Sequence, residues 1–109
     1  MRQARILFRE VEAGVLTQSD NGSFTFRYHD LWMEDSTKPP ISLTMPKTRQ
    51  EYHSQFLFPC FYQLLPEGSN KEAVCAMNRI DPDDDFGILL TSAKHDSTGV
   101  IRVIKIEKS

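Results

Sequence analysis

The chain has 109 residues, of which 39% are apolar, and a net charge of −2 at neutral pH. This length suits one domain with a modest core of its own. The thirteen Lys and Arg residues are never adjacent, so the basic surface of a nucleic-acid-binding protein is not expected. No apolar run is long enough for a signal peptide or a membrane span. We therefore expect a cytoplasmic protein that binds neither nucleic acid nor membrane directly.

The N-terminal third is predicted to form an antiparallel meander. Strands are expected at residues 4–10 and 14–18, with a connection at 11–13. Residues 19–22 (Ser-Asp-Asn-Gly) indicate a tight turn, because Asn and Gly tolerate a positive φ. Polar and aromatic residues then alternate over residues 23–28, which predicts a half-buried strand.

The next segment is predicted to contain one helical turn and one more strand. Residues 29–35 are amphipathic, and we expect Asp30 to cap a turn that buries Leu31 and Trp32. Residues 41–45 alternate again and are predicted to form a strand. Residues 46–52 are polar and are expected to be exposed.

The densest apolar run of the chain predicts a central helix over residues 57–65. Pro59 suits the first turn of a helix, and the sequence Pro-Glu-Gly that follows residue 65 ends it. Four apolar residues are spaced at i, i+3, i+4 and i+7, and should lie on one buried face. They are Phe58, Phe61, Tyr62 and Leu65.

Two further helices and a strand are predicted after this helix. Ser69 and Glu72 have the spacing of a capping box, so a helix should begin at Ser69 and run to Arg79. The acidic run 81–85 should end it and start a short helix over residues 86–90. Residues 99–106 are rich in β-branched side chains and predict a strand at the centre of the sheet. The inward side chains of the second helix are predicted to be Ala73, Val74, Met77 and Ile80.

These elements together predict an α+β fold. A small antiparallel sheet, made of the meander and the closing C-terminal strand, should pack with two to three helices. The sequence contains no repeat and no linker, so residues 1–109 are expected to form a single domain.

Candidate catalytic and metal-binding residues were sought among the acids, histidines and cysteines. The run 81–85 resembles the start of a calcium loop, but Phe86 stands where the loop needs Gly and Ser92 where it needs an acid. Cys60 and Cys75 have no metal-ligand spacing and should be reduced and buried. The three histidines, at 29, 53 and 95, are expected in separate turns or loops, and there is no glycine-rich phosphate loop. We expect no catalytic residue, metal or cofactor; a small enzyme with a cysteine nucleophile is the alternative.

Four motifs of this chain resemble the N-terminal region of HipA-type serine/threonine kinase toxins. Residues 24–28, 31–32 and 40–46 (FTFRY, LW and PISLTMP) are similar to the family's opening signature "F-x-Y…W…PISLSLP". Residues 61–68 (FYQLLPEG) resemble "F-x-N-L-L-P-E-G", and residues 83–90 with 98–101 resemble the closing "D-D-x-F-x-L-L…GAV". The motifs occur in order and at the family's spacing from about residue 4 to residue 106.

The resemblance implies a protein that works with a kinase of this family. It ends where the family's first subdomain ends, before the ATP-binding and catalytic loops, and so implies a stand-alone form similar to the HipS antitoxins of bacterial HipB–HipS–HipT systems. Such a protein would bind and inhibit a HipT-like serine/threonine kinase toxin, in a ternary complex with a HipB-like DNA-binding protein. A non-inhibitory scaffold or a phosphorylation substrate of the kinase is the alternative within the same family.

The loop between the first two long predicted helices is the candidate partner-binding site, because it should project where a partner can receive it. Relatives often carry Trp directly after the Leu-Pro-Glu-Gly sequence, where this chain has Ser69, so an aromatic anchor at that position is not available to it. The candidate binding residues are Leu65, Pro66, Glu67, Gly68, Ser69 and Asn70.

Overall fold

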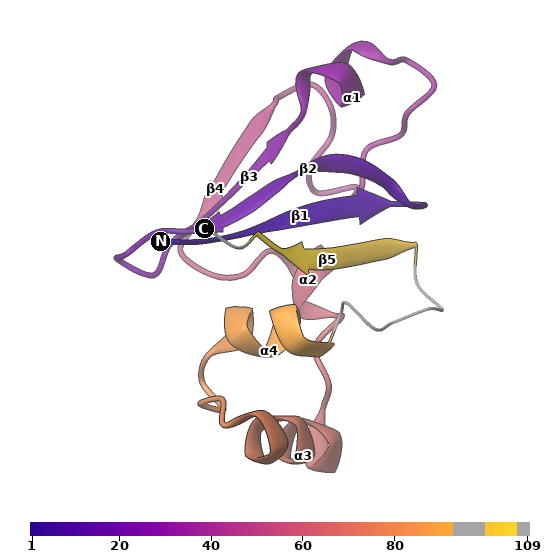
Figure 1. Cartoon of the computed structure of the whole chain (residues 1–109). Coiled ribbons are helices and arrows are strands. Elements are labelled where there is room, and N and C mark those ends of the chain that lie inside the picture. Colours follow the sequence, from indigo (N-terminus) through magenta and orange to yellow (C-terminus); the bar gives the residue numbers. More distant parts are fainter. Residues whose placement is uncertain (93–99, 107–109) are drawn as a thin grey trace.

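The computed structural model describes residues 1–92 and 100–106, which form one antiparallel sheet, four helices and the segments that connect them. The sheet has five strands in the order β4-β3-β2-β1-β5 (Figure 1). The predicted α+β class, with an antiparallel sheet packed against helices, is confirmed. The strands are β1 (Arg2–Phe8), β2 (Val11–Gln18), β3 (Phe24–Tyr28), β4 (Glu51–Ser54) and β5 (Ile101–Lys105). The helices are α1 (Asp30–Glu34), α2 (Pro59–Tyr62), α3 (Gly68–Asn78) and α4 (Asp85–Ser92).

The predicted meander is confirmed, with one change in its first turn. In β3 the three aromatic residues are buried and the residues between them are not, as the alternation predicts. The turn between β1 and β2 lies at Arg9 and Glu10, whose φ angles are 50° and 68°, and not at residues 11–13. These residues carry a left-handed turn without glycine, so the usual sequence marker of a tight hairpin is missing.

Residues 41–45 do not form the predicted strand, and β4 forms ten residues later instead. The hydroxyl of Tyr28 donates a hydrogen bond to the carbonyl of Met45 (2.6 Å) and accepts one from the amide of Ile41 (3.0 Å). The buried side chain of Tyr28, rather than a neighbouring strand, therefore holds residues 41–45. The place beside β3 is taken by β4, which pairs Tyr52 with Phe26. Residues 46–52, predicted to be exposed, are exposed only in part, because Glu51 and Tyr52 belong to β4 and are half-buried.

The last strand, β5, lies at the edge of the sheet and not at its centre. It pairs with β1, placing Val103 opposite Ile6, and both side chains are fully buried. Its β-branched residues therefore indicate only that one face of the strand is buried. An edge strand can have such a face as well as a central strand. The predicted loop at 92–97, the strand residue Gly99 and the tail at 108–109 lie partly or wholly outside the described residues.

The core lies between the sheet and the helices α2 and α4. Figure 1 shows α4 directly below the sheet, and the Phe86 ring stacks on Phe24 of β3 with 6.0 Å between centroids. Phe61 of α2 is fully buried and lies 5.9 Å from the ring of Phe26. The predicted helix over 57–65 is shorter than expected, because α2 ends at Tyr62 and the chain continues in turns to Leu65. The ring of Tyr62, predicted to be buried, is 58% exposed.

Helix α3 lies outside this core, contrary to its predicted inward face. It packs against α4 on the side away from the sheet (Figure 1). Cys75 is its buried residue, Val74 is half-buried, and Met77 is 84% exposed. The helix begins at Gly68 after an N-cap at Glu67 without a side-chain cap, so the capping box predicted at Ser69 does not form. Since α4 already covers the sheet, α3 packs on the outer side of α4.

Helix α1 buries one of the two residues predicted for it. Trp32 is buried, and its indole N–H donates a hydrogen bond to the carbonyl of Pro39 at 3.0 Å. Leu31, also predicted to be buried, is 81% exposed. The helix starts after His29, without a side-chain cap from Asp30. No helix within the described residues has the length and apolarity that a membrane crossing requires.

Candidate partner-binding loop

The candidate loop, residues 65–70, consists of the end of the connection from α2 and the first three residues of α3. Leu65 and Pro66 are half-buried, whereas the four residues from Glu67 to Asn70 are exposed. The amide of Leu65 donates to the carbonyl of Tyr62 at 3.0 Å, which ties the start of the loop to the end of α2. Leu65 packs against the core from its edge. The loop is therefore anchored at its first residues and presents its last four to solvent.

A left-handed turn at Gly68 sets the direction in which the loop enters α3. Glu67 is extended, with φ −123° and ψ 156°, and Gly68 follows with φ +57°. Glycine adopts this region without strain, whereas another residue would strain the backbone there. The Glu67 carbonyl accepts hydrogen bonds from the amides of Asn70 (3.2 Å) and Lys71 (3.4 Å), so it closes the first turn of α3. The Glu67 carboxylate is thus left at the surface, beside the first turn of the helix.

The other residues singled out from the sequence do not gather at this loop. His29 lies with its Nε2 atom 2.5 Å from Glu12, and His53 belongs to β4, where its Nδ1 atom lies 3.0 Å from the Thr25 hydroxyl. The expectation of a loop for His53 was wrong, and His95 lies outside the described residues. Within residues 1–92 and 100–106, no group of three or more His, Cys, Asp or Glu side chains is arranged to hold a metal ion.

Both cysteines are buried, as predicted, and neither forms a disulfide. Burial raises the pKa of the Cys60 thiol to about 12, partly offset by a hydrogen bond from Ser42. A thiol is a nucleophile only as its thiolate, so Cys60 is poorly suited to covalent catalysis. The geometry of Cys60 is that of a small core residue.

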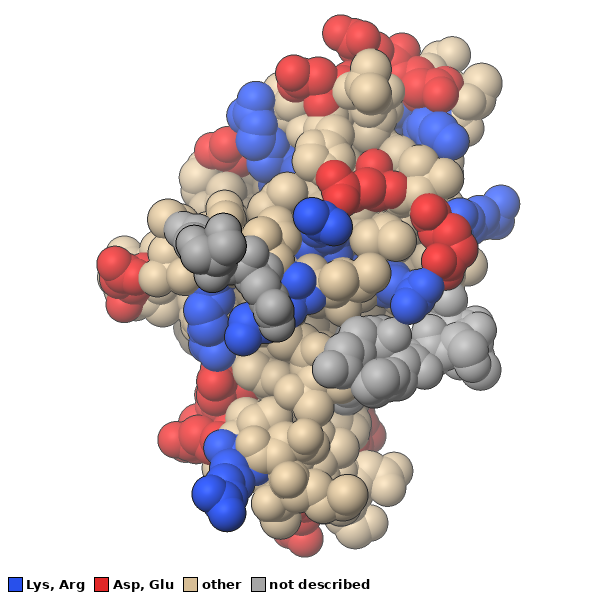
Figure 2. Space-filling view, in the orientation of Figure 1, with Lys and Arg blue, Asp and Glu red and all other residues tan. Residues whose placement is uncertain are grey.

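An uncharged area lies on the part of the surface where α3 is found. Figure 2 shows this area in the lower part of the visible face, where α3 lies in Figure 1, with acidic and basic side chains along its edge. Ala73, Ala76 and Met77 are exposed on this helix. The sequence assigned Ala73 and Met77 to the core, because periodicity alone does not tell a buried helix face from an exposed one.

A family model described as the HipA N-terminal domain matches residues 4–104. The chain belongs to the HipA N-terminal domain family. A solved structure titled "N-terminal domain of HipA toxin" is 30% identical in sequence, with a TM-score of 0.72. The superposition covers 100% of this chain and 96% of that chain. The recognition made from the four motifs is confirmed, and it relates the chain to HipA-type toxin systems.

Two curated relatives differ greatly in length. A protein of Sinorhizobium fredii (strain NBRC 101917 / NGR234) named "Putative kinase Y4mE" is 30% identical over 76 residues, which are 70% of this chain and 18% of that protein. An uncharacterized protein of Haemophilus influenzae (strain ATCC 51907 / DSM 11121 / KW20 / Rd) is 35% identical over 80 residues, 73% of this chain and 72% of that protein. The chain is thus similar to a segment of a long protein and also to most of a short one.

Proposed function

We propose that this HipA N-terminal domain protein is a regulatory subunit that binds a HipT-like serine/threonine kinase toxin and inhibits it, without enzymatic activity of its own. The observation that carries the proposal is the loop at residues 65–70. In a chain of this family, a left-handed turn at Gly68 presents the carboxylate of Glu67 and the polar side chains of Ser69 and Asn70 together at the surface. The cytoplasm, where such a kinase acts, is the proposed location.

The loop alone is too small to form the whole interface. A stable protein complex buries about 1,600 Å² in total, and a few central residues supply most of the binding energy. The exposed uncharged side of α3, with Ala73, Ala76 and Met77, directly continues the loop and supplies further area. A separate subunit needs this area, because it lacks the high effective concentration that a covalent linker provides.

The test is co-expression with a HipA-like kinase that lacks this domain and is encoded beside the chain. Glu67→Lys and Ser69→Arg change exposed loop residues and should weaken kinase binding by tenfold or more, or about 1.4 kcal/mol. Both should also abolish rescue of growth when the kinase is induced. Glu34→Lys, which reverses the charge of an exposed residue on α1, is the matched control and should bind and rescue like the parent.

Two results would count against the proposal. If folded Glu67→Lys and Ser69→Arg both bind and rescue like the parent, the loop is not the contact. If the parent forms no complex with the kinase and does not restore growth, the inhibitory role itself is wrong. Circular dichroism of each variant verifies that its fold is intact.

A second role, as a phosphorylation substrate of the kinase, is favoured by the position of Ser69. Its hydroxyl is exposed in the second position of α3, within the loop that we propose contacts the kinase. Incubation with kinase and ATP, followed by mass spectrometry, should then show one added phosphoryl group that is lost in Ser69→Ala. Gel filtration with a HipB-like DNA-binding protein tests for the ternary complex in the same experiment series.

A further inference from the structure

Two exposed aromatic rings border an open depression beside the sheet. Phe56 is 78% exposed and Tyr62 is 58% exposed, although most aromatic rings of this chain are buried. Between them and the connection from α3 to α4 lies a depression of about 260 Å³, whose walls include Asp83 and Asp85. We call this feature, defined by Phe56, Tyr62, Asp83 and Asp85, the aromatic–acidic groove.

Each exposed ring lies next to residues that are buried in the core. The amide of Phe56 donates to the Ser54 hydroxyl at the end of β4, and the next two residues, Leu57 and Phe58, turn inward and are buried. Tyr62 ends α2, directly after the fully buried Phe61. Burying apolar ring surface favours association, so both rings are available to a partner that covers them.

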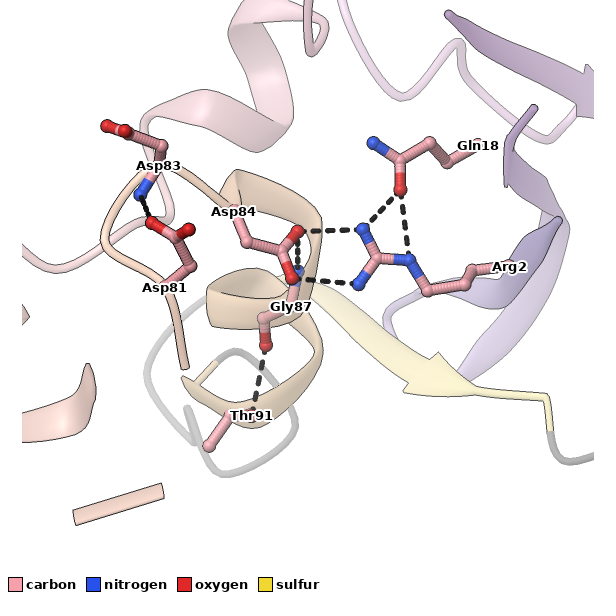
Figure 3. A network of polar contacts seen from close by, with 7 residues as sticks. All are labelled: Arg2, Gln18, Asp81, Asp83, Asp84, Gly87 and Thr91. Carbon is pink, nitrogen blue, oxygen red and sulfur yellow. Dashed lines mark hydrogen bonds and ion pairs between the residues drawn. The ribbon is translucent and has the colours of Figure 1, made fainter. Parts of the chain in front are cut away.

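The acidic wall of the groove carries charge that the described part of the chain does not neutralise. Of its three aspartates, Asp84 forms an ion pair with Arg2, at 2.7 Å. Within residues 1–92 and 100–106, the carboxylates of Asp83 and Asp85 have no basic partner. Figure 3 shows Asp83 pointing away from the Arg2 guanidinium that binds Asp84. No Lys or Arg is among the described residues that line the groove.

We infer that the aromatic–acidic groove binds a basic segment of a partner protein, with an Arg or Lys side chain laid along the rings of Phe56 and Tyr62 and its charge against Asp83 and Asp85. A guanidinium is attracted to the face of an aromatic ring, and its aliphatic stem covers apolar surface. The groove is smaller than the 300–1,000 Å³ sites that enclose whole small ligands, but it accommodates one or two side chains. Its negative charge repels nucleic acid and anionic lipid surfaces, which leaves a protein segment as the partner. This inference does not depend on the proposed kinase complex.

The test is a titration of the ¹⁵N-labelled chain with a short peptide, acetyl-Gly-Ser-Arg-Leu-Arg-Ser-Gly-amide, followed by NMR. The amide signals of Gln55, Tyr62 and Asp85 should shift in a saturable way, and the affinity should fall when salt is raised, because exposed charge pairs are screened. The same peptide with Gln in place of both Arg residues should produce no saturable shift. Because no kinase is present, this result is separate from success or failure of kinase inhibition.

Variants assign the binding to the two walls of the groove. The double variant Asp83→Asn/Asp85→Asn should weaken peptide binding about fivefold and flatten its salt dependence, while Tyr62→Ala should weaken it by a similar factor. Leu43→Ala and Glu34→Gln change exposed residues that do not line the groove, and should bind like the parent. Absence of saturable shifts with the Arg peptide, an equal response to the Gln peptide, or unchanged affinity in both groove variants would overturn the inference.

Discussion

Arg2 and Asp84 are 82 residues apart in sequence and form a two-pronged ion pair, with Nη1 to Oδ2 at 3.0 Å and Nη2 to Oδ1 at 2.7 Å (Figure 3). Arg2 also donates to the side-chain carbonyl of Gln18, and its guanidinium lies 5.2 Å from the centroid of the Phe86 ring. Asp84 in turn accepts a hydrogen bond from the amide of Gly87 at 3.1 Å. One guanidinium thus joins the start of β1 to the first turn of α4. Within the motif at residues 83–90, Asp84 therefore fastens α4 to the sheet.

Replacing Asp84 with Asn should lower the stability of the fold. The change removes the negative charge of the group that accepts two hydrogen bonds from the Arg2 guanidinium. Hydrogen bonds to charged groups contribute roughly 1.5–3 kcal/mol to stability when they are shielded from water. The two side chains are 39% and 31% exposed, so we expect a smaller loss, of about 1 kcal/mol. Urea unfolding measures it. Asp83→Asn, which leaves the Arg2 contacts in place, is the matched control and should stay within about 0.5 kcal/mol of the parent.

The same ion pair predicts how stability depends on pH. The hydrogen bond from Arg2 holds the pKa of Asp84 below its usual value, with burial opposing and the Gly87 amide reinforcing the shift. As pH falls, the unfolded chain takes up this proton first, so the stabilisation is present above the ordinary carboxyl pKa of about 4 and is lost as pH falls through the lower pKa of the folded state. The stability difference between the parent and Asp84→Asn should therefore shrink on acidification below about pH 4. A difference that stays constant down to full acidification would show that the carboxylate charge is not the cause.

Gly87→Ala should destabilise the protein although alanine is the better helix former. An added Cβ atom would lie 2.5 Å from Oδ2 and 3.0 Å from Cγ of Asp84, so that carboxylate would have to leave Arg2. In the background Asp84→Ala the carboxylate is absent, and Cγ2 of Ile80, at 3.3 Å from the added Cβ atom, is the remaining close contact. The same change should then stabilise, by less than the roughly 1 kcal/mol that helix propensity alone predicts. The measurement is a double-mutant cycle of urea unfolding energies. The same sign of effect in both backgrounds would contradict this account.

Much of the sheet could be predicted from the sequence because its alternation is local. Phe24 and Phe26 are buried and Arg27 is exposed, as a period of two requires. Residues 41–45 show the same alternation, yet Leu43 is 96% exposed while Ile41 and Met45 are buried. Their partner is the hydroxyl of Tyr28, a tertiary contact that no local pattern encodes.

The helices and the candidate site show the same limit. The periodicity of α3 is real, but Met77 faces solvent because α4 already occupies the face of the sheet. The existence of an exposed connection at Glu67 and Ser69 could be predicted from Pro and Gly between two apolar periodic segments. The exposure of Phe56 could not, since aromatic residues in a dense apolar run are usually assigned to the core.

Cys60 should react with thiol reagents only when the protein unfolds. With the pKa of its thiol raised to about 12 by burial, the thiolate fraction at pH 8 is on the order of one in ten thousand, against about a quarter for a free cysteine. Labelling with a disulfide reagent in the Cys75→Ser background, with and without urea, measures this difference. Fast labelling of the native protein would instead support the alternative of a small enzyme with a cysteine nucleophile.

Tyr28→Phe should destabilise the protein by about 1–3 kcal/mol, since it deletes only the buried hydroxyl and keeps the ring. The fully buried hydroxyl bonds both the Ile41 amide and the Met45 carbonyl, and its removal leaves two buried backbone groups without that partner.

Burial also raises the pKa of Tyr28 to about 12. The unfolded chain releases this proton near pH 10, so the parent should lose stability between about pH 10 and 12, and Tyr28→Phe should lose less over that range. Tyr62→Phe, which removes the hydroxyl of a largely exposed ring, is the control and should unfold at the urea concentration of the parent. If Tyr28→Phe also unfolds there, the hydroxyl is not what holds residues 41–45 against the sheet.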